Sequence, residues 1–302
     1  MRRHFIAILA FLLIGLSAYS QLVSSATVIH AGLLIDGTGS EPSEEMSIIV
    51  HDGLIRSIET GFITPGPEDE YIDLGGYTII PGLMDMHVHL ASEYSSKSYL
   101  ERISLNEADY AIRAVVNAKK TLLAGFTTVR NLGDSNLVTI SLRNSIEEGL
   151  VDGPRIYSSG KTIATSGGHG DGTNSLRKDL SKDPGASDGI INNKDDAYKA
   201  VRYRYKEGAD LIKITATGGV LSVAKSGQNP QMTEEEIRAI VTTAKDYDFR
   251  VAAHAHGAEG IKRAVRAGVH SIEHGTLMDS EGMNLMKERG TYYVPTIIAG
   301  LW

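Results

Sequence analysis

The residues of this 302-residue chain with the most evident chemistry are histidines that end apolar segments. His87 and His89 are two residues apart, and so are His254 and His256. Because alternate residues of an extended strand point to the same face, each pair can offer two imidazoles to one cation. His274 ends another apolar segment. A single pair with this spacing is a weak signal, but several histidines at the mouth of one barrel predict a metal site.

Lys213 is the most informative single residue, because it lies inside the apolar segment 211–216. Strand alternation places Ile212 and Ile214 on the outer face and Lys213 and Thr215 on the inner face. An ammonium group inside a barrel loses its hydration and needs compensation. Two interpretations follow. Either Lys213 pairs with an acid across the barrel, or its neutral amine has added carbon dioxide to form a carbamate whose two oxygens bridge two metals.

The composition narrows the chemistry further. Cysteine is absent, which excludes thiolate ligands, iron–sulfur clusters and thiol nucleophiles, so a metal must be held by His, Asp, Glu or a modified residue. The 30 basic and 37 acidic residues give a net charge of −7. This balance excludes the basic surface that nucleic-acid binding requires. The glycine-rich stretch 167–170 lacks the spacing of a nucleotide-binding loop.

An alternation of strands and helices must position these residues. After Pro81, seven apolar strands alternate with helical segments, which predicts parallel strands joined by helical crossovers. Seven such units favour an α/β fold of the (β/α)8 TIM-barrel type over a doubly wound sheet. The predicted strands cover residues 83–87, 127–130, 155–158, 211–216, 251–255, 271–274 and 292–297. The predicted helices include residues 106–123, 137–149, 194–206, 233–246 and 258–267, and Thr233 with Glu236 forms a capping box.

Three segments are predicted along the chain. Residues 1–26 have the basic, apolar and small-residue order of a signal peptide, which predicts export to the periplasm or the medium. Their apolar run is too short to span a bilayer, so we expect no stable membrane insertion after cleavage. Residues 27–80 contain short β segments at 27–30, 46–50, 54–57 and 77–80, with turns indicated at 36–37, 52–53 and at Gly75 and Gly76. They predict a small N-terminal β-sheet or sandwich domain. Residues 81–302 form the barrel, and we expect it to be truncated before strand 8, because the chain stops at Trp302.

The residues that carry this pattern resemble the amidohydrolase superfamily of binuclear metal hydrolases. The resemblance rests on His87, His89, Lys213, His254 and His274 on predicted strands 1, 4, 5 and 6, and on the stretch PGLMDMHVH at 81–89. The stretches TSGGHG at 165–170, TGGVLS at 217–222 and QMTE at 231–234 look like the prolidase-type branch, which includes Xaa-Pro dipeptidases and imidazolonepropionase-like enzymes. The resemblance extends from about residue 27 to the end of the chain.

The resemblance implies a reaction and a ligand set. His87, His89 and one oxygen of carbamylated Lys213 would hold the first of two divalent ions, with zinc as the expected metal. The other carbamate oxygen, His254 and His274 would hold the second. A hydroxide that bridges the metals would hydrolyse the carbon–nitrogen bond of a dipeptide or N-acyl amino acid. Lys213, His254 and His274 thus count as catalytic, and two further histidines, His169 and His256, are expected to face the substrate. The partner is a small amide, and a homo-oligomer remains open.

Three alternatives remain open. The family uses an Asp at the end of strand 8 as metal ligand and proton shuttle, and no residue of this chain takes that place, so an inactive or metal-binding fragment is one alternative. A mononuclear deaminase of the same superfamily is the second, although such enzymes have a Glu where this chain has Gly257. His169 as a solvated loop residue is the third.

Overall fold

The structure is a computed structural model that describes residues 25–300, apart from 221 and 223–225. Residues 1–24 of the predicted signal peptide therefore lie outside the described residues. The chain divides between Pro81 and Gly82 into two compact units, the sheet unit before this point and the barrel unit after it. In the described part of the chain, no helix combines the length and the apolar character that a bilayer span requires.

The sheet unit is one four-stranded sheet with the order β3-β2-β1-β4. Its strands are β1 (Thr27–Leu34), β2 (Ser43–His51), β3 (Leu54–Thr60) and β4 (Glu70–Ile79). β1 pairs antiparallel with β2 and parallel with β4. Strand β4 begins well before the predicted segment 77–80 and runs through Gly75 and Gly76, which the sequence pattern indicated as a turn. The glycine that close backbone approach requires is Gly32 of β1, since a Cβ there would lie 2.2 Å from the Gly75 carbonyl oxygen.

The barrel unit alternates strands and helices along its whole described length. Its strands are β5 (Leu83–Val88), β6 (Phe126–Asn131), β7 (Arg155–Ser158), β8 (Ala164–Thr165), β9 (Ile190–Ile191), β10 (Ile212–Thr215), β11 (Val251–Gly257), β12 (Ser271–Leu277) and β13 (Tyr292–Val294). Its α-helices are α2 (Ser98–Ser104), α3 (Glu107–Leu123), α4 (Val138–Glu147), α5 (Lys194–Lys206), α6 (Glu234–Asp246), α7 (Ala258–Ala267) and α8 (Ser280–Arg289), and its 3-10 helices are Ala186–Asp188 and Ile297–Gly300. All seven predicted barrel strands are confirmed within a few residues.

Two parallel sheets, β5-β6-β7 and β10-β11-β12-β13, supply these seven strands. They continue into one another, because the Asp210 N–H donates to the Ser158 carbonyl oxygen over 2.8 Å. Ile163 also forms a parallel bridge with Ile214 of β10. The short strands β8 and β9 pair with each other in a segment where no element was predicted. The order matches an incomplete TIM-type barrel, as predicted.

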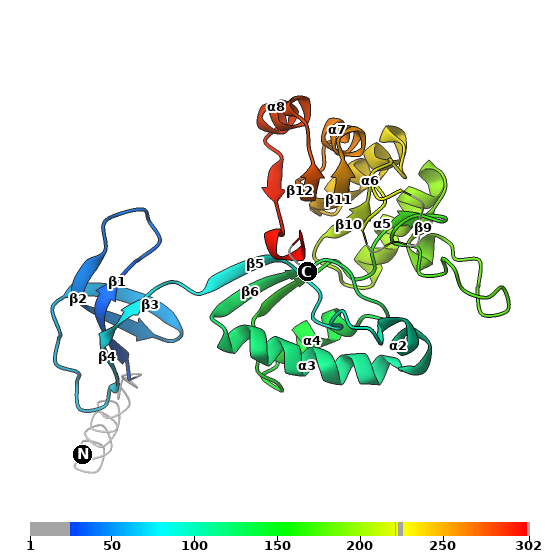
Figure 1. The fold of residues 1–302 in the computed structure, drawn as a ribbon. Helices are drawn as coiled ribbons and strands as arrows, with labels where there is room; N and C mark the ends of the chain where they lie inside the picture. The colour runs from blue at the N-terminus through cyan, green and yellow to red at the C-terminus, as the bar shows by residue number, and fades with distance from the viewer. Residues whose placement is uncertain (1–24, 221, 223–225, 301–302) are drawn as a thin grey trace, which may run out of the picture. The chain divides into compact units, whose positions relative to one another are not determined.

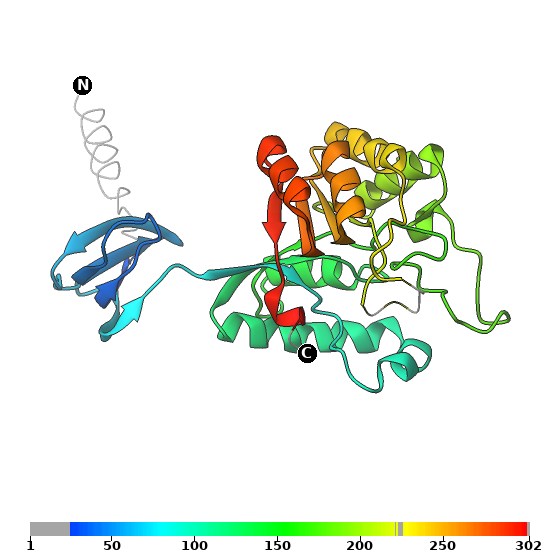
Figure 2. The same cartoon turned by 45° about the horizontal axis from the view of Figure 1, so that its top comes forward.

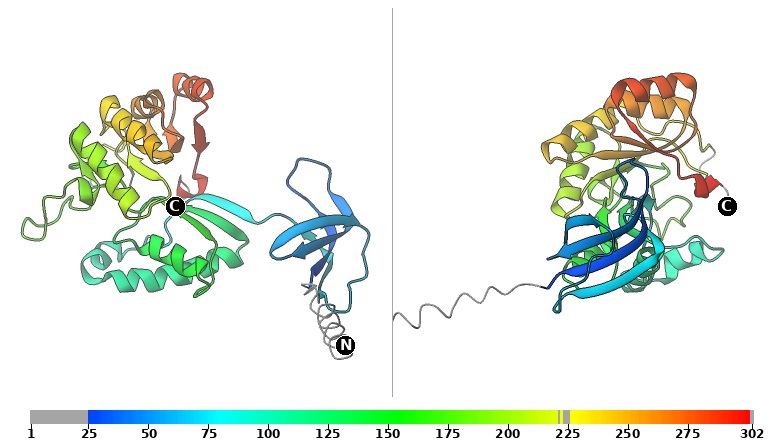
Figure 3. Two further views of the ribbon diagram at one scale, coloured as in Figure 1. Left: turned by 180° about the vertical axis from the view of Figure 1, so that it is seen from behind. Right: turned by 90° about the vertical axis from the view of Figure 1, so that its left-hand side faces the viewer.

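The helices lie outside the strands. Figure 1 shows α3 and α4 beside β5 and β6, and α5 to α8 around β10 to β12. The turned view in Figure 2 and the rear view in Figure 3 show the same layering. Apolar packing explains it, since Ile212 and Ile214 of β10 join Ile237 and Ile240 of α6 in the largest buried cluster. The capping box of Thr233 is present, with its Oγ1 accepting from the Glu236 N–H.

Candidate metal centre

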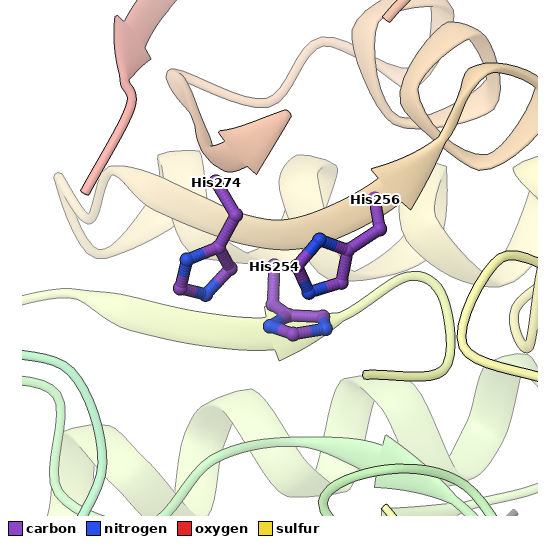
Figure 4. Close-up of side chains that lie close together, drawn as sticks. All are labelled: His254, His256 and His274. Atoms are coloured by element: carbon purple, nitrogen blue, oxygen red, sulfur yellow. The ribbon is translucent and has the colours of Figure 1, made fainter. Parts of the chain in front are cut away.

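Five imidazoles form a continuous cluster at β5, β11 and β12. The ring of His274 has its centroid 4.9 Å from that of His87, 4.7 Å from His254 and 5.0 Å from His256. One nitrogen each of His254, His256 and His274 lies within 4.8 Å of the others, so these three could hold a metal ion, and Figure 4 shows the rings facing a common space. His89 extends the cluster with its ring 5.4 Å from that of His87.

In two of these rings, one nitrogen donates a hydrogen bond to a group that can only accept it. The His87 Nδ1–H donates to Oε2 of Glu273 over 2.9 Å. The His274 Nδ1 lies 2.7 Å from the Thr296 Oγ1, and the Thr296 hydroxyl in turn donates to the Pro295 carbonyl oxygen over 2.8 Å. Because the Thr296 proton is used by that carbonyl, Oγ1 accepts from His274. In both rings the bare lone pair therefore lies on Nε2.

Backbone carbonyls fix two further rings in the same way. The His89 Nδ1–H donates to the Gly133 oxygen over 3.1 Å, which leaves Nε2 bare. The His254 Nε2–H donates to the Gly218 oxygen over 3.0 Å, which leaves Nδ1 bare. His256 differs, since its Nδ1 lies 2.9 Å from the Thr276 hydroxyl, which can donate or accept. In each of the four histidines of the predicted ligand set, a hydrogen-bond acceptor thus determines which ring nitrogen has the proton. This is usual for histidines that bind a metal.

The position of His274 depends on a break in strand alternation. Ala255 pairs with His274 and Gly257 pairs with Leu277, so β12 has one extra residue opposite β11, which is a β-bulge. His274 has a φ of 71° and Gly275 a φ of 56°, both in the left-handed region. This backbone is unfavourable for a histidine and is maintained by its surroundings. It brings His274 to the same interior as its neighbour Glu273.

Lys213 is buried, with 3% of its surface exposed, between two isoleucines of the main core. Burial lowers the pKa of Lys213 from 10.5 to about 8, while the negative charge of Glu273 opposes this shift. No hydrogen bond or ion pair joins its ammonium group to another residue in the part of the chain that the structure describes. An acid near Lys213 therefore exists, as one interpretation required, but it forms its direct bonds with other residues.

That acid, Glu273, was missed by the sequence analysis. It is fully buried, and its Oε1 accepts from the Arg130 guanidinium over 2.7 Å and from the Ser271 hydroxyl over 2.6 Å. Burial alone would raise its pKa, but the hydrogen bond from His87 and the positive charges of Lys213 and Arg130 lower the pKa of Glu273 to about 2. The sequence pattern could have indicated Glu273, because it is a charged residue within an apolar strand segment. Lys213 was found in the same way.

His169 lies on the opposite side of His254, with the two rings stacked 4.3 Å apart. Its N–H donates to Oε1 of Gln231 over 2.8 Å, and its Nδ1 is buried without a hydrogen-bond partner. A Cβ on Gly219 would lie 2.5 Å from the His169 ring, so only glycine allows this close contact. His169 is therefore part of the cluster, and the alternative of a solvated loop residue is wrong.

The electrostatics of the cluster suit a cation. Burial lowers the pKa of His87 to about 3 and that of His274 to about 2, and it lowers the pKa of His254 well below 6.5. At neutral pH these rings are therefore uncharged, which is the form that binds a metal. Uncharged imidazoles with directed lone pairs, next to the ionised Glu273, fit a divalent cation, whereas the positive charge of a protonated Lys213 opposes one.

Comparisons with known proteins agree with this geometry. The profile of the amidohydrolase family matches residues 78–301. A crystal structure of a Xaa-Pro dipeptidase with bound methionine in the active site is 56% identical, with a TM-score of 0.88, and the alignment covers 91% of this chain and 68% of that one. A prolidase complexed with N-methylphosphonate-L-proline is 32% identical, with a TM-score of 0.81, over 91% of this chain and 67% of that one.

Another similar protein is named for a different activity. The ochratoxinase of Aspergillus niger is 30% identical over 294 residues, which are 90% of this chain. The chain spans 59% of the length of that protein. The similar proteins thus include a Xaa-Pro dipeptidase, a prolidase and an ochratoxinase.

Proposed function

The chain belongs to the amidohydrolase family, and from this premise we propose that it provides the metal site of a hydrolase that cleaves carbon–nitrogen bonds in Xaa-Pro dipeptides or N-acyl amino acids. The observation that carries the proposal is the set of four imidazoles, each with one nitrogen engaged by an acceptor and the other bare. The names Xaa-Pro dipeptidase and prolidase among the similar structures support the amide-bond chemistry and a dipeptide substrate.

The proposed ligand set is the one predicted from the sequence. His87 and His89 would hold one divalent ion through Nε2, His254 through Nδ1 and His274 through Nε2 would hold the second, and a carbamate on Lys213 would join them. The lowered pKa of Lys213 supports the carbamate, because only the neutral amine adds carbon dioxide. Bound zinc would polarise the substrate carbonyl and lower the pKa of a water molecule.

The substrate side of the site would be formed by His169 and His256. His169 stacks on the ring of His254 and has an unpartnered buried Nδ1, so it has a free polar atom for a substrate group. His256 lies beside His254 and His274, and its Thr276 contact leaves its protonated nitrogen undetermined. We propose that both rings bind the carboxylate or the carbonyl of a small substrate.

One observation weighs against the deaminase alternative. The position at which such enzymes have a Glu is Gly257 here, and a Cβ on Gly257 would lie 2.0 Å from the Gln228 carbonyl oxygen. No side chain fits there without moving the backbone of the neighbouring loop. A single-metal deaminase therefore receives no support from this site.

Metal content and substrate turnover test the proposal together. The purified chain would be dialysed against metal-free buffer with bicarbonate, loaded with zinc, and measured by inductively coupled plasma mass spectrometry. We expect two zinc ions per chain and hydrolysis of Xaa-Pro dipeptides or N-acyl amino acids, with both abolished by a chelator. Turnover that survives complete metal removal would contradict the proposal.

Two other outcomes identify the alternatives. Two tightly bound metal ions without turnover on either substrate class would indicate a metal-binding fragment. One metal ion per chain with ammonia release from a purine or pyrimidine would indicate a deaminase. The His274→Asn variant serves as the site control, and it should bind less metal than the parent chain.

We also propose that the chain is exported, on the basis of the basic and apolar order of residues 1–20. Fusion of residues 1–26 to a reporter that is active only outside the cytoplasm tests this. A reporter that stays inactive, while a known export signal activates it, would contradict the proposal.

A further inference from the structure

A buried polar network links three strands below the imidazoles. Glu273 of β12 accepts from His87 of β5 with one oxygen and from Arg130 of β6 with the other. Arg130 is itself anchored, because its Nε–H donates to the Met86 carbonyl oxygen over 2.7 Å. The side chains of His87, Arg130 and Glu273 are exposed by 7%, 9% and 0%. The carboxylate therefore has a fixed position in the interior.

His87 is unlike the other three proposed ligands in its acceptor. Those of His89 and His254 are backbone carbonyls and that of His274 is a neutral hydroxyl, whereas His87 donates to an ionised carboxylate. A hydrogen bond to a charged acceptor is roughly twice as strong as a neutral one. It also makes the opposite ring nitrogen a better electron donor to a metal.

We propose that Glu273 is a positioning residue that holds His87 with its proton on Nδ1 and its lone pair on Nε2, aimed at the metal. This inference rests on the proposed function, since it requires that His87 be a metal ligand. Arg130 and Ser271 both donate to Oε1 of Glu273, so that Oε2 remains for His87. The network needs two acceptor oxygens, and a carboxylate has both.

Glu273→Gln is the informative variant, because an amide has the same shape but only one oxygen. If that oxygen faces Arg130, the amide N–H groups face His87 and favour the tautomer with its proton on Nε2. We expect one of the two zinc sites to weaken by about 10–100-fold, as for other partners of metal ligands, while the second site keeps its affinity. Competition with a chromophoric chelator measures the two dissociation constants.

Nitrogen NMR of the metal-free protein gives a readout that does not depend on activity. Two-bond proton–nitrogen correlations of histidine-labelled protein show which ring nitrogen has the proton. We expect Nδ1–H for His87 in the parent chain and Nε2–H, or a mixture, in Glu273→Gln. An unchanged His87 tautomer in the variant would overturn the proposal.

A double-mutant cycle separates positioning from general stability. In a His87→Ala background, Glu273→Gln should cause no further loss of zinc affinity, because the ring on which it acts is gone. The matched control is Glu207→Gln, which removes the carboxylate 3.0 Å from the equally buried Arg204, away from the histidines. It should lower the urea midpoint without changing either zinc site. Additive losses in the cycle would overturn the inference.

Failure of the inference is distinguishable from failure of the proposed function. If the parent chain binds no zinc, the metal site itself is refuted, and the NMR experiment alone decides the role of Glu273. If the parent binds two zinc ions and Glu273→Gln binds them equally well, only the positioning role is refuted. Tighter zinc binding by Glu273→Gln would also refute the positioning role. It would indicate instead that the charge of Glu273 keeps Lys213 protonated.

Discussion

The two halves of the barrel unit hold their histidines in different ways. In the β10–β13 half, which comprises β10–β13 with α5–α8, residues of both strands and helices form one large buried apolar cluster. In the β5–β7 half, which comprises β5–β7 with α2–α4, the buried cluster is small, and α3 leaves Ile112 and Val116 more than half exposed. His254 and His274 belong to the first half, and His87 and His89 to the second.

The difference shows that apolar packing and polar bonding share the task of positioning the site. The β10–β13 half supports the strands of His254 and His274 by apolar packing, in addition to the hydrogen bonds of the two rings, with β11 buried along its whole length. The β5–β7 half relies on individual hydrogen bonds, from His89 to a backbone carbonyl and from His87 to Glu273 of the opposite half. Substitutions in the apolar cluster of the first half should therefore act on stability, and those in the polar network on metal binding.

The largest effect is expected for Lys213→Ala, which removes the proposed bridge between the two halves. We expect kcat/KM to fall by roughly 10³-fold or more, since a metal contributes several kcal/mol to transition-state stabilisation. Metal content should fall with it, and added acetate or propionate should partly restore both. Unchanged metal content, measured by mass spectrometry, would contradict the carbamate.

A matched pair of core substitutions tests the packing difference. Ile240 of α6 is fully buried, and Ile112 of α3 is 67% exposed. Ile240→Ala should lower the free energy of unfolding by about 2–5 kcal/mol, and Ile112→Ala should change it by less than about 0.5 kcal/mol. Urea denaturation followed by circular dichroism measures both. Equal losses would show that α3 is as well packed as α6, and the comparison would fail.

The pH dependence of stability tests the burial of the ionisable groups that join the two halves. The folded pKa of His87 is about 3, below its ordinary 6.5, so between these values the unfolded chain takes up a proton that the folded chain does not. Glu273, with a folded pKa of about 2 instead of 4.5, contributes stability that is lost as the pH falls below 4.5. Both shifts predict that stability falls with decreasing pH, by roughly 1.4 kcal/mol per pH unit for each group.

Urea midpoints of the metal-free protein between pH 7 and pH 4.5 measure the His87 part of this slope. The His87→Gln variant, which has no ring to protonate, serves as the control and should show a flatter profile. A parent profile as flat as that of the variant would mean that burial of the His87 ring contributes nothing to the pH dependence.

The smallest effect is expected for His169→Ala, because this ring touches His254 without belonging to the proposed ligand set. Loss of one polar contact to a charged substrate group should raise KM by about 10-fold. Zinc content should stay the same. Gln231→Ala, which removes the side chain that positions the His169 backbone, should have a smaller effect in the same direction. A large loss of zinc in His169→Ala would place this ring among the ligands.

The sequence pattern was sufficient for the strands and for the clustering of histidines. Apolar strands of four or more residues have a clear period, and helices such as α5 and α7 begin and end where charge and glycine indicate. The pattern failed for β8 and β9, because two-residue strands have no period. It also failed at Gly75 and Gly76, because paired glycines are typical of turns but lie here inside strand β4.

The site was predictable as a set of residue types but not as a hydrogen-bond network. His87, His254 and His274 were found because strand ends of a barrel point to one mouth. Glu273 was not, because alternation assigns only one of two consecutive residues to the interior, and His274 already had that place. The bulge in β12, which sets this rule aside, depends on the backbone of residues 274 and 275 and leaves no mark in the period of the sequence.

The extra residue in β12 has a consequence for how chains of this kind can diverge. A deletion of one residue at Gly275 would restore regular pleating and rotate the His274 ring out to the helical layer, while Glu273 stayed inside. An insertion or deletion at this point should therefore remove the His274 ring from the cluster, whereas a substitution of a neighbouring residue leaves the ring in position. A change of chain length at residues 274–276 should thus alter the histidine cluster more than a substitution elsewhere in the strand.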